Sequence, residues 1–196
     1  MNKGHTMTTS TDLRGSALVL IDLQKGILGF SKAPHSAEQV LARAGRLVAH
    51  FRSAGSPVVR VKVGWSADGG DRLMQPTDAP APAAPPSPSD WLDDPDTLPT
   101  EASDLRILKR QWNAFHGTEL DLQLRRRGIR RIVLAGIATP FGVEGTARAA
   151  WELGYELVVV EDACGAPVEA AHQASMAHVL PRLGHVRTTA QVLEAS

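Results

Sequence analysis

The stretch of residues 131–148, RIVLAGIATPFGVEGTAR, decides the fold. Its first apolar run, residues 132–135, is typical of a buried strand and ends at Gly136. A short turn, residues 137–140, leads into a helical pattern, so the stretch predicts a strand, a tight turn and a helix N-terminus. Backbone N–H groups at such a turn favour negative charge. Because ligands of open α/β sheets bind beyond the carboxyl ends of the strands, we expect the active site here.

The rest of the chain alternates between two patterns. Short strand patterns occupy residues 16–22, 58–63, 105–108, 156–160 and 184–187, and the continuous apolar run in the first of them is typical of a parallel sheet. Helical patterns occupy residues 37–54, 119–127, 143–153, 168–180 and 189–194. This alternation predicts a parallel sheet with helices on both faces. A chain of 196 residues fits one domain of ordinary size.

Two segments fall outside this alternation. Residues 1–15 lack the apolar core of a signal peptide and predict a flexible tail before a single domain of residues 16–196. Residues 66–100 hold most of the prolines and are too long for an ordinary connection. We interpret them as an inserted arm that lies over the pocket mouth or against a partner subunit. Trp91 and Leu92 are apolar anchors that favour docking of this arm.

Composition narrows the range of partners and compartments. The formal net charge is zero, which favours neither a nucleic acid nor a membrane surface as partner. No apolar run approaches the ~18 residues that a membrane span needs. The single Cys cannot form an internal disulfide, which fits a reducing cytoplasm. We therefore expect a cytoplasmic protein that binds a small-molecule substrate.

Three motifs carry a family resemblance. The segment GIATPFGVEGTARAA, residues 136–150, resembles the signature of the isochorismatase-like (cysteine hydrolase) superfamily. That signature has a Gly, two residues, a Thr, two residues, a nucleophilic Cys and then V-E-x-T-A-R. Gly142 stands at the Cys position, as it does in true isochorismatases. Asp22, in a D-x-Q motif after the first strand, and Lys109, upstream of A-F-x-G-T, also agree, so the resemblance spans residues 17 to about 192.

The resemblance implies a fold and a site. The fold is a three-layer α/β/α, Rossmann-like domain with a six-stranded parallel sheet in the order 3-2-1-4-5-6, a cis peptide bond between Ile137 and Ala138, and a homodimeric or higher homo-oligomeric assembly. Asp22 and Lys109 are implied as catalytic residues, with Gly142 in place of the nucleophile. Further residues are expected to contact substrate or an oxyanion: Gln24, Phe30, Trp65, Phe115, Ile137, Ala138, Thr139 and Phe141.

Residue types alone leave these roles open. An Asp after a strand is usually a cap, and a Lys at a strand end is usually solvated. Trp65 fits packing under the following loop as well as a pocket wall. The family motifs favour catalytic roles for Asp22 and Lys109. Cys164 lies off the family position and is more typical of a small packing residue than of a displaced nucleophile.

We expect no metal ion and no cofactor. The nicotinamidase branch of the superfamily carries an Asp-x-His metal motif near the end of the second strand, and this chain has none there. His172 and His178 are neither three nor four residues apart, so they do not form a helical metal-binding pair. We therefore do not expect nicotinamidase activity.

Three functions remain open because Gly142 removes the attacking thiolate of the cysteine members. The first is hydrolysis of a vinyl ether, as in isochorismatase. Asp22 would be the acid, which requires burial to raise its pKa against the effect of Lys109. The second is amide hydrolysis by a water molecule that Asp22 activates. The third is a non-catalytic ligand-binding or assembly protein, and retention of both Asp22 and Lys109 argues against it. We predict a hydrolase.

Overall fold

A parallel sheet forms the centre of the computed structural model, which describes residues 13–79 and 88–195. Its six strands lie in the order β3-β2-β1-β4-β5-β6, and every pair of neighbours is parallel. The strands are β1 (Ser16–Ile21), β2 (Val58–Val63), β3 (Leu105–Lys109), β4 (Arg131–Ile137), β5 (Glu156–Gly165) and β6 (His185–Arg187). The predicted strand order is confirmed.

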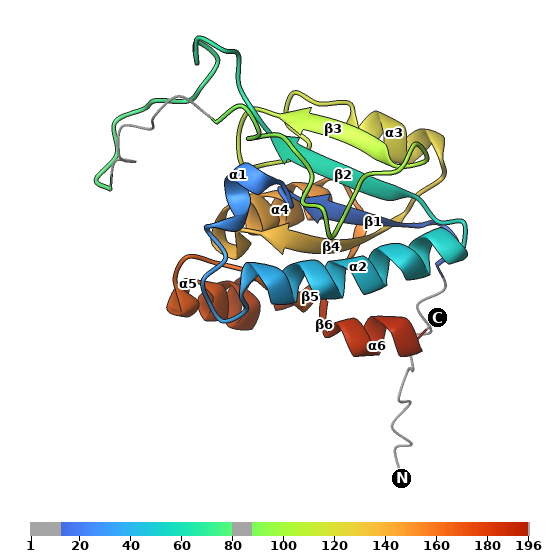
Figure 1. Cartoon of the computed structure of the whole chain (residues 1–196). Helices are drawn as coiled ribbons and strands as arrows, with labels where there is room; N and C mark the ends of the chain where they lie inside the picture. The colour runs from blue at the N-terminus through green and yellow to red at the C-terminus, as the bar shows by residue number, and fades with distance from the viewer. Residues whose placement is uncertain (1–12, 80–87, 196) are drawn as a thin grey trace.

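Helices cover both faces of the sheet, so the three-layer prediction is also confirmed (Figure 1). They are α1 (Lys25–Leu28), α2 (Ala37–Ser53), α3 (Leu120–Arg126), α4 (Glu144–Glu152), α5 (Glu169–Ala174) and α6 (Thr189–Glu194). Helices α2 and α6 contact each other on one face, while α3 and α4 lie behind the sheet in Figure 1. None of the helices in the described part of the chain combines the length and apolar character needed to cross a membrane.

The core lies along the two central strands. Every residue of β1 is buried, and β4 is buried from Ile132 to its end. Gly136 allows these strands to approach each other, because a Cβ at this position would overlap the backbone of Ile21. Its φ of 136° is also one that side chains rarely adopt. The close approach brings the loop after β1 beside the turn after β4.

Several predicted boundaries are wrong. Strand β5 does not end at residue 160 but continues to Gly165, because its pairing with β4 shifts register after Leu134 and resumes at Gly136. The helix predicted for residues 143–153 is preceded by a π-helical turn, η1 (Thr139–Val143), in which the N–H of Val143 donates to the carbonyl of Ala138. The helix predicted for residues 168–180 divides into α5, a π-helical turn (Ser175–Val179) and a 3₁₀ turn (Leu180–Arg182).

Residues 13–15 do not belong to a flexible tail as predicted. Residues 1–12 lie outside the described part of the chain. Leu13 is buried, and its carbonyl accepts hydrogen bonds from Ser16 N and Ser56 Oγ. The carbonyl of Gly15 accepts from Arg130 N and Arg131 N. Residues 13–15 therefore pack against the domain.

Trp91 and Leu92 attach the described end of the arm to the rest of the chain. Residues 80–87 of the arm lie outside the described residues, and the segment before them projects away from the sheet in Figure 1. The Trp91 Nε1 donates to the carbonyl of Val63 at 2.8 Å, and its ring fills the space where Gly26 has no side chain. The Leu92 side chain packs in the same way over Gly64. The arm therefore docks on α1 and on the end of β2 in its own chain.

Candidate active site

Asp22 and Lys109 form a buried ion pair at the carboxyl edge of the sheet. Asp22 follows β1, and Lys109 is the last residue of β3, two strands away. Lys109 Nζ lies 2.7 Å from Asp22 Oδ2, and the exposed fractions of the two side chains are only 1% and 7%. Asp22 has a φ of 53°, which is rare for a residue with a side chain and accompanies functional positions. The structure thus brings together the two predicted catalytic residues.

Burial dominates the electrostatics of Asp22. Removal from water raises the pKa of its carboxyl to about 6, although the charge and the hydrogen bond of Lys109 lower it. Within the described residues, the second carboxylate oxygen, Oδ1, is buried and has no hydrogen-bond partner. A carboxyl with a pKa near neutrality and one free oxygen is suited to proton transfer.

Lys109 is held by two acceptors. Its Nζ donates to Asp22 Oδ2 and, at 3.0 Å, to the carbonyl of Gln111. An ammonium group has three N–H donors, so one of them is left for a ligand as far as the described residues extend. Lys109 therefore has the means to orient both Asp22 and an anionic group of a substrate.

Gly142 faces this ion pair from the turn η1. A Cβ at Gly142 would lie 3.2 Å from Asp22 Oδ2 and 3.6 Å from Lys109 Nζ. It would also lie 2.9 Å from a methyl group of Ile21, which would have to shift. A side chain at position 142 would therefore lie beside both charged groups.

The turn that carries Gly142 is mostly buried and is held by backbone hydrogen bonds. The Ile137–Ala138 peptide bond is cis. Ile137 and Thr139 are fully buried, and Ala138 is nearly so. The N–H groups of Phe141 and Val143 both donate to the carbonyl of Ala138. The Thr139 hydroxyl points away from the pair, toward the Gly165 carbonyl and the ring of His172.

Two aromatic rings lie on the exposed side of the turn. Phe141 and Trp112 are 40% and 64% exposed, and their ring centroids are 4.9 Å apart. Phe141 is one of the residues predicted to contact substrate, whereas Trp112, three residues after Lys109, was not predicted. Phe30, which follows α1, is half exposed. Exposed aromatic surface next to a polar centre is suited to contact with a planar or apolar part of a ligand.

Three other predicted site residues make contacts that hold neighbouring strands and loops together. Gln24 is fully buried and binds both the N–H and the carbonyl of Val63, together with the carbonyl of Trp91. The Trp65 indole donates to the Arg110 carbonyl, and its ring packs near Trp91. Phe115 stacks on Tyr155, which precedes β5 at the opposite edge of the sheet. These positions favour support of the surrounding loops over contact with a substrate.

A second polar cluster contains the residues that could hold a metal ion. His35, Glu161 and His172 place their ligand atoms within 4.8 Å of one another. Hydrogen bonds from His172 and His35 lower the pKa of Glu161 to about 2, although partial burial opposes this shift. We refer to these residues as the His35–Glu161–His172 cluster. They come from three different elements, so neither a local motif nor the spacing of the histidines along one helix indicated the cluster.

Cys164 does not have the properties of a nucleophile. It is completely buried, and this burial raises the pKa of its thiol to about 12. A reactive Cys needs access and a lowered pKa. The interpretation of Cys164 as a packing residue agrees with this environment.

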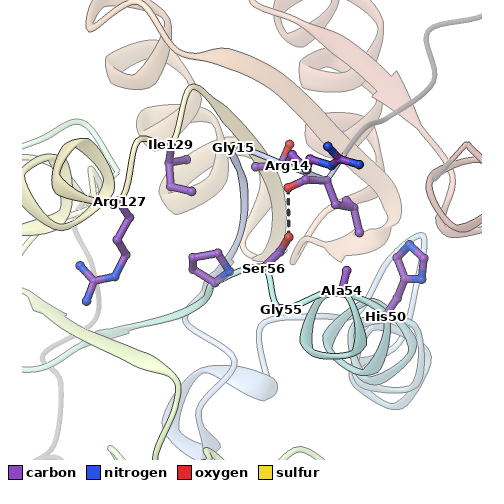
Figure 2. A pocket seen from close by; sticks show the side chains of 11 residues that line it. Arg14, Gly15, His50, Ala54, Gly55, Ser56, Arg127 and Ile129 are labelled. Carbon is purple, nitrogen blue, oxygen red and sulfur yellow. Dashed lines mark hydrogen bonds between the residues drawn. The ribbon is translucent and has the colours of Figure 1, made fainter.

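A cavity of about 720 Å³ lies at the opposite edge of the sheet. Figure 2 shows that it is lined by residues near the beginnings of strands and by the end of α2, including Arg14, Ser56 and His50. It also borders Leu13, where the described part of the chain begins. Ligands of open α/β sheets bind at the other edge, so this cavity is not the candidate active site.

Comparisons with known proteins agree with the fold and the motifs. The family model described as Isochorismatase domain matches residues 16–191. The isochorismatase family protein YecD of Escherichia coli is 54% identical over 180 residues, which cover 92% of this chain and 95% of the relative. The solved structure of an isochorismatase family protein from Burkholderia thailandensis has a TM-score of 0.89 and 42% identity, and covers 93% of this chain and 95% of that one.

A shorter match concerns a protein with a named substrate. The ureidoacrylate amidohydrolase RutB of Acinetobacter baylyi is 42% identical over 96 residues. The match covers 48% of this chain and 39% of that relative.

Proposed function

Since this chain belongs to the isochorismatase family, we propose that it hydrolyses a small vinyl ether without a covalent nucleophile, as an isochorismatase does with isochorismate. The family membership makes the chain a hydrolase. The choice of substrate and the roles of Asp22, Lys109 and Gly142 are the proposal.

The observation that supports it is the environment of Asp22. The carboxyl is buried, its pKa is raised to about 6, and its Oδ1 has no partner among the described residues. Gly142 puts no side chain beside Oδ2, where the thiol would stand in the cysteine members, and a methyl group of Ile21 lies close to this place. A buried acid remains at this site, and an attacking side-chain atom does not.

The reaction needs no attacking side chain. The protonated carboxyl of Asp22 donates its proton to the terminal CH₂ carbon of the vinyl ether, which leaves an oxocarbenium ion. Water adds to this ion, and Asp22 takes back a proton. The resulting hemiketal breaks its C–O bond, so that isochorismate and water become pyruvate and a dihydroxy acid.

Lys109 has two tasks in this mechanism. Its charge stabilises the carboxylate that Asp22 becomes after proton transfer, because the two groups are only 2.7 Å apart in a buried site. The N–H donor not used by Asp22 or Gln111 is available for a carboxylate of the substrate. The Trp112 and Phe141 rings offer a surface for the ring of the substrate.

The test is release of pyruvate from isochorismate by the wild type and by Asp22→Asn. We expect the variant to lose about 100-fold or more in kcat, the scale of general acid catalysis. Thermal unfolding of both proteins checks that the variant folds. Absence of pyruvate release from the wild type would contradict the choice of substrate, and equal release from both would contradict the role of Asp22.

Amide hydrolysis is a second candidate, favoured by the partial match to an amidohydrolase. In that case the Asp22 carboxylate would activate water, and turnover of small amides would proceed without a covalent adduct. Gly142→Cys, with Gly142→Ala as the matched control, probes this option. Acquisition of iodoacetamide-sensitive amidase activity by the Cys variant alone would support a site of the cysteine type. Both variants must first move the Ile21 methyl group.

A further inference from the structure

Three potential metal ligands converge on the far side of the turn from Asp22. His35 lies in the loop before α2, Glu161 in β5 and His172 in α5. Glu161 Oε1 is 3.1 Å from His35 Nε2 and 3.2 Å from His172 Nε2. The two imidazole rings meet edge to face, with centroids 5.9 Å apart. Both imidazole nitrogens thus lie beside the same carboxylate oxygen, and the three possible ligand atoms are within 4.8 Å of one another.

The loop that carries His35 is fixed in place. The carbonyl of Ala166 accepts hydrogen bonds from Lys32 N and Ala33 N, and Ala166 N donates back to the carbonyl of Ala33. The Ser31 hydroxyl donates to the carbonyl of His35 at 2.9 Å. The loop therefore holds His35 against the end of β5, and the cluster does not depend on a freely moving segment.

Thr139 orients the third ligand. Its hydroxyl has one proton and lies 3.2 Å from the carbonyl of Gly165, which can only accept. When the hydroxyl donates there, it accepts from the Nδ1–H of His172, 2.8 Å away. A neutral His172 then has its lone pair on Nε2 and turns it toward Glu161 Oε1. This tautomer differs from the one in which Nε2 donates to Glu161 Oε1: both atoms, 3.2 Å apart, are then acceptors, and a cation between them would replace the hydrogen bond.

We propose that the His35–Glu161–His172 cluster binds one zinc-like divalent metal ion, with water as the fourth ligand. Tetrahedral zinc with ligands at ~2.0–2.2 Å places neighbouring ligand atoms roughly 3.3 Å apart, close to the separations of Glu161 Oε1 from the two nitrogens, while the two nitrogens lie within 4.8 Å of each other. Two imidazole nitrogens favour Zn²⁺, Co²⁺ or Ni²⁺ over Mg²⁺ and Ca²⁺, which prefer oxygen ligands. Thr139 serves as the outer group that orients a ligating His.

The site is accessible and separate from the Asp22–Lys109 pair. Side chains of Glu161 and His35 are 32% and 17% exposed, so an ion can enter from solvent, while His172 is 2% exposed. The expectation of no metal rested on the region after the second strand and on one helix, neither of which contains this group of ligands. A bound ion would tie the His35 loop, β5 and α5 together behind the turn that carries Gly142.

The test is titration of the full chain, stripped of metal by a chelator, with Zn²⁺ in a calorimeter, and with Co²⁺ under visible absorption. We expect one ion per chain and a Co²⁺ spectrum of the tetrahedral type. His35→Ala and Glu161→Gln, both at partly exposed positions, should each weaken binding about 100-fold or more. His178→Ala is the matched control, because His178 is exposed and lies outside the cluster.

Two outcomes would overturn the proposal. Absence of Zn²⁺ and Co²⁺ binding to the folded wild type would show that the cluster is a hydrogen-bonded network complete in itself. Binding that His35→Ala and Glu161→Gln leave unchanged, or that His178→Ala weakens equally, would place the ion elsewhere. Circular dichroism of each variant checks that the chain stays folded.

Discussion

The Asp22–Lys109 pair and the His35–Glu161–His172 cluster each hold a carboxylate beside nitrogen groups, yet their carboxylates have opposite properties. Burial raises the pKa of Asp22 to about 6, whereas hydrogen bonds from two histidines lower that of Glu161 to about 2. The Asp22 side chain is 7% exposed and that of Glu161 is 32% exposed. At Asp22, desolvation therefore shifts the pKa more than the neighbouring Lys109 does. At Glu161, the hydrogen bonds shift the pKa more than desolvation does.

This difference assigns different chemistry to the two regions. A carboxyl with a pKa near neutrality can give and take a proton, which is the task proposed for Asp22. A carboxylate that stays ionised cannot, but it is the form that binds a cation. The turn η1 lies between the two regions, since Gly142 faces Asp22 while Thr139 contacts His172.

The largest effect is expected from Gly136→Ala, because this substitution disturbs the backbone that both regions share. The new Cβ would overlap the backbone of Ile21, which precedes Asp22, and Gly136 also pairs with Cys164 of β5. We expect destabilisation of more than about 4 kcal/mol, measured by urea unfolding, with loss of both activity and metal binding. Gly154→Ala is the control: its φ of 80° is also unusual, but nothing lies within 4 Å of the added Cβ.

Lys109→Met should impair turnover at the Asp22–Lys109 pair without changing metal binding at the His35–Glu161–His172 cluster. It removes the charge beside Asp22, so we expect kcat/KM for the vinyl ether to fall about 100-fold. Because Lys109 lowers the pKa of Asp22, the pKa in the pH profile should rise above 6. Zn²⁺ binding at the His35–Glu161–His172 cluster should stay unchanged in the same protein. An unchanged kcat/KM would contradict the role of Lys109 in turnover.

The pH dependence distinguishes an acid from a base at Asp22. With a pKa of about 6, the protonated form is lost above that pH, so kcat/KM of vinyl-ether hydrolysis should fall about tenfold per pH unit there. Water activation by the carboxylate, as in the amide alternative, would give the opposite slope below pH 6. The measurement is kcat/KM between pH 5 and 8, with Asp22→Asn as the control that should lose this dependence.

The sequence predicted the Asp22–Lys109 pair well because strand ends and family motifs are local signals. Continuous apolar runs located β1 and β4, and the motifs at Asp22 and Lys109 then placed two residues 87 positions apart beside each other. The strand order followed from the family resemblance. Homo-oligomer formation and cytoplasmic location stay predictions.

There are physical reasons why the sequence did not indicate the His35–Glu161–His172 cluster. Its members belong to a loop, an irregular strand and a helix, and the register shift that extends β5 past residue 160 is set by pairing with β4 rather than by local preference. Trp112 was missed because an exposed Trp has no periodic pattern. The φ of Asp22 and the two π-helical turns likewise depend on tertiary packing.

Thr139→Val tests whether the turn links the two regions. The substitution keeps the shape but leaves the Gly165 carbonyl and His172 Nδ1 without the hydroxyl between them. We expect a loss of about 1–3 kcal/mol in thermal or urea unfolding, and Zn²⁺ binding weakened about 10-fold to 100-fold. Ser53→Ala, which removes an exposed hydroxyl, is the control. Unchanged Zn²⁺ binding in the Val variant would show that Thr139 does not orient His172.

Trp112→Ala should have the smallest effect and concerns the substrate side of the Asp22–Lys109 pair alone. The ring is 64% exposed and contacts Phe141, so we expect the free energy of unfolding to change by no more than about 0.5 kcal/mol. An aromatic contact with substrate is worth about 1 kcal/mol, which corresponds to a roughly fivefold rise in KM. Because this contact is the same in ground state and transition state, kcat should stay unchanged.

Trp151→Ala removes a Trp of similar exposure on α4 and should leave KM as it is. A fall in kcat without a change in KM would mean that Trp112 positions Gln111 and Lys109 instead of holding substrate.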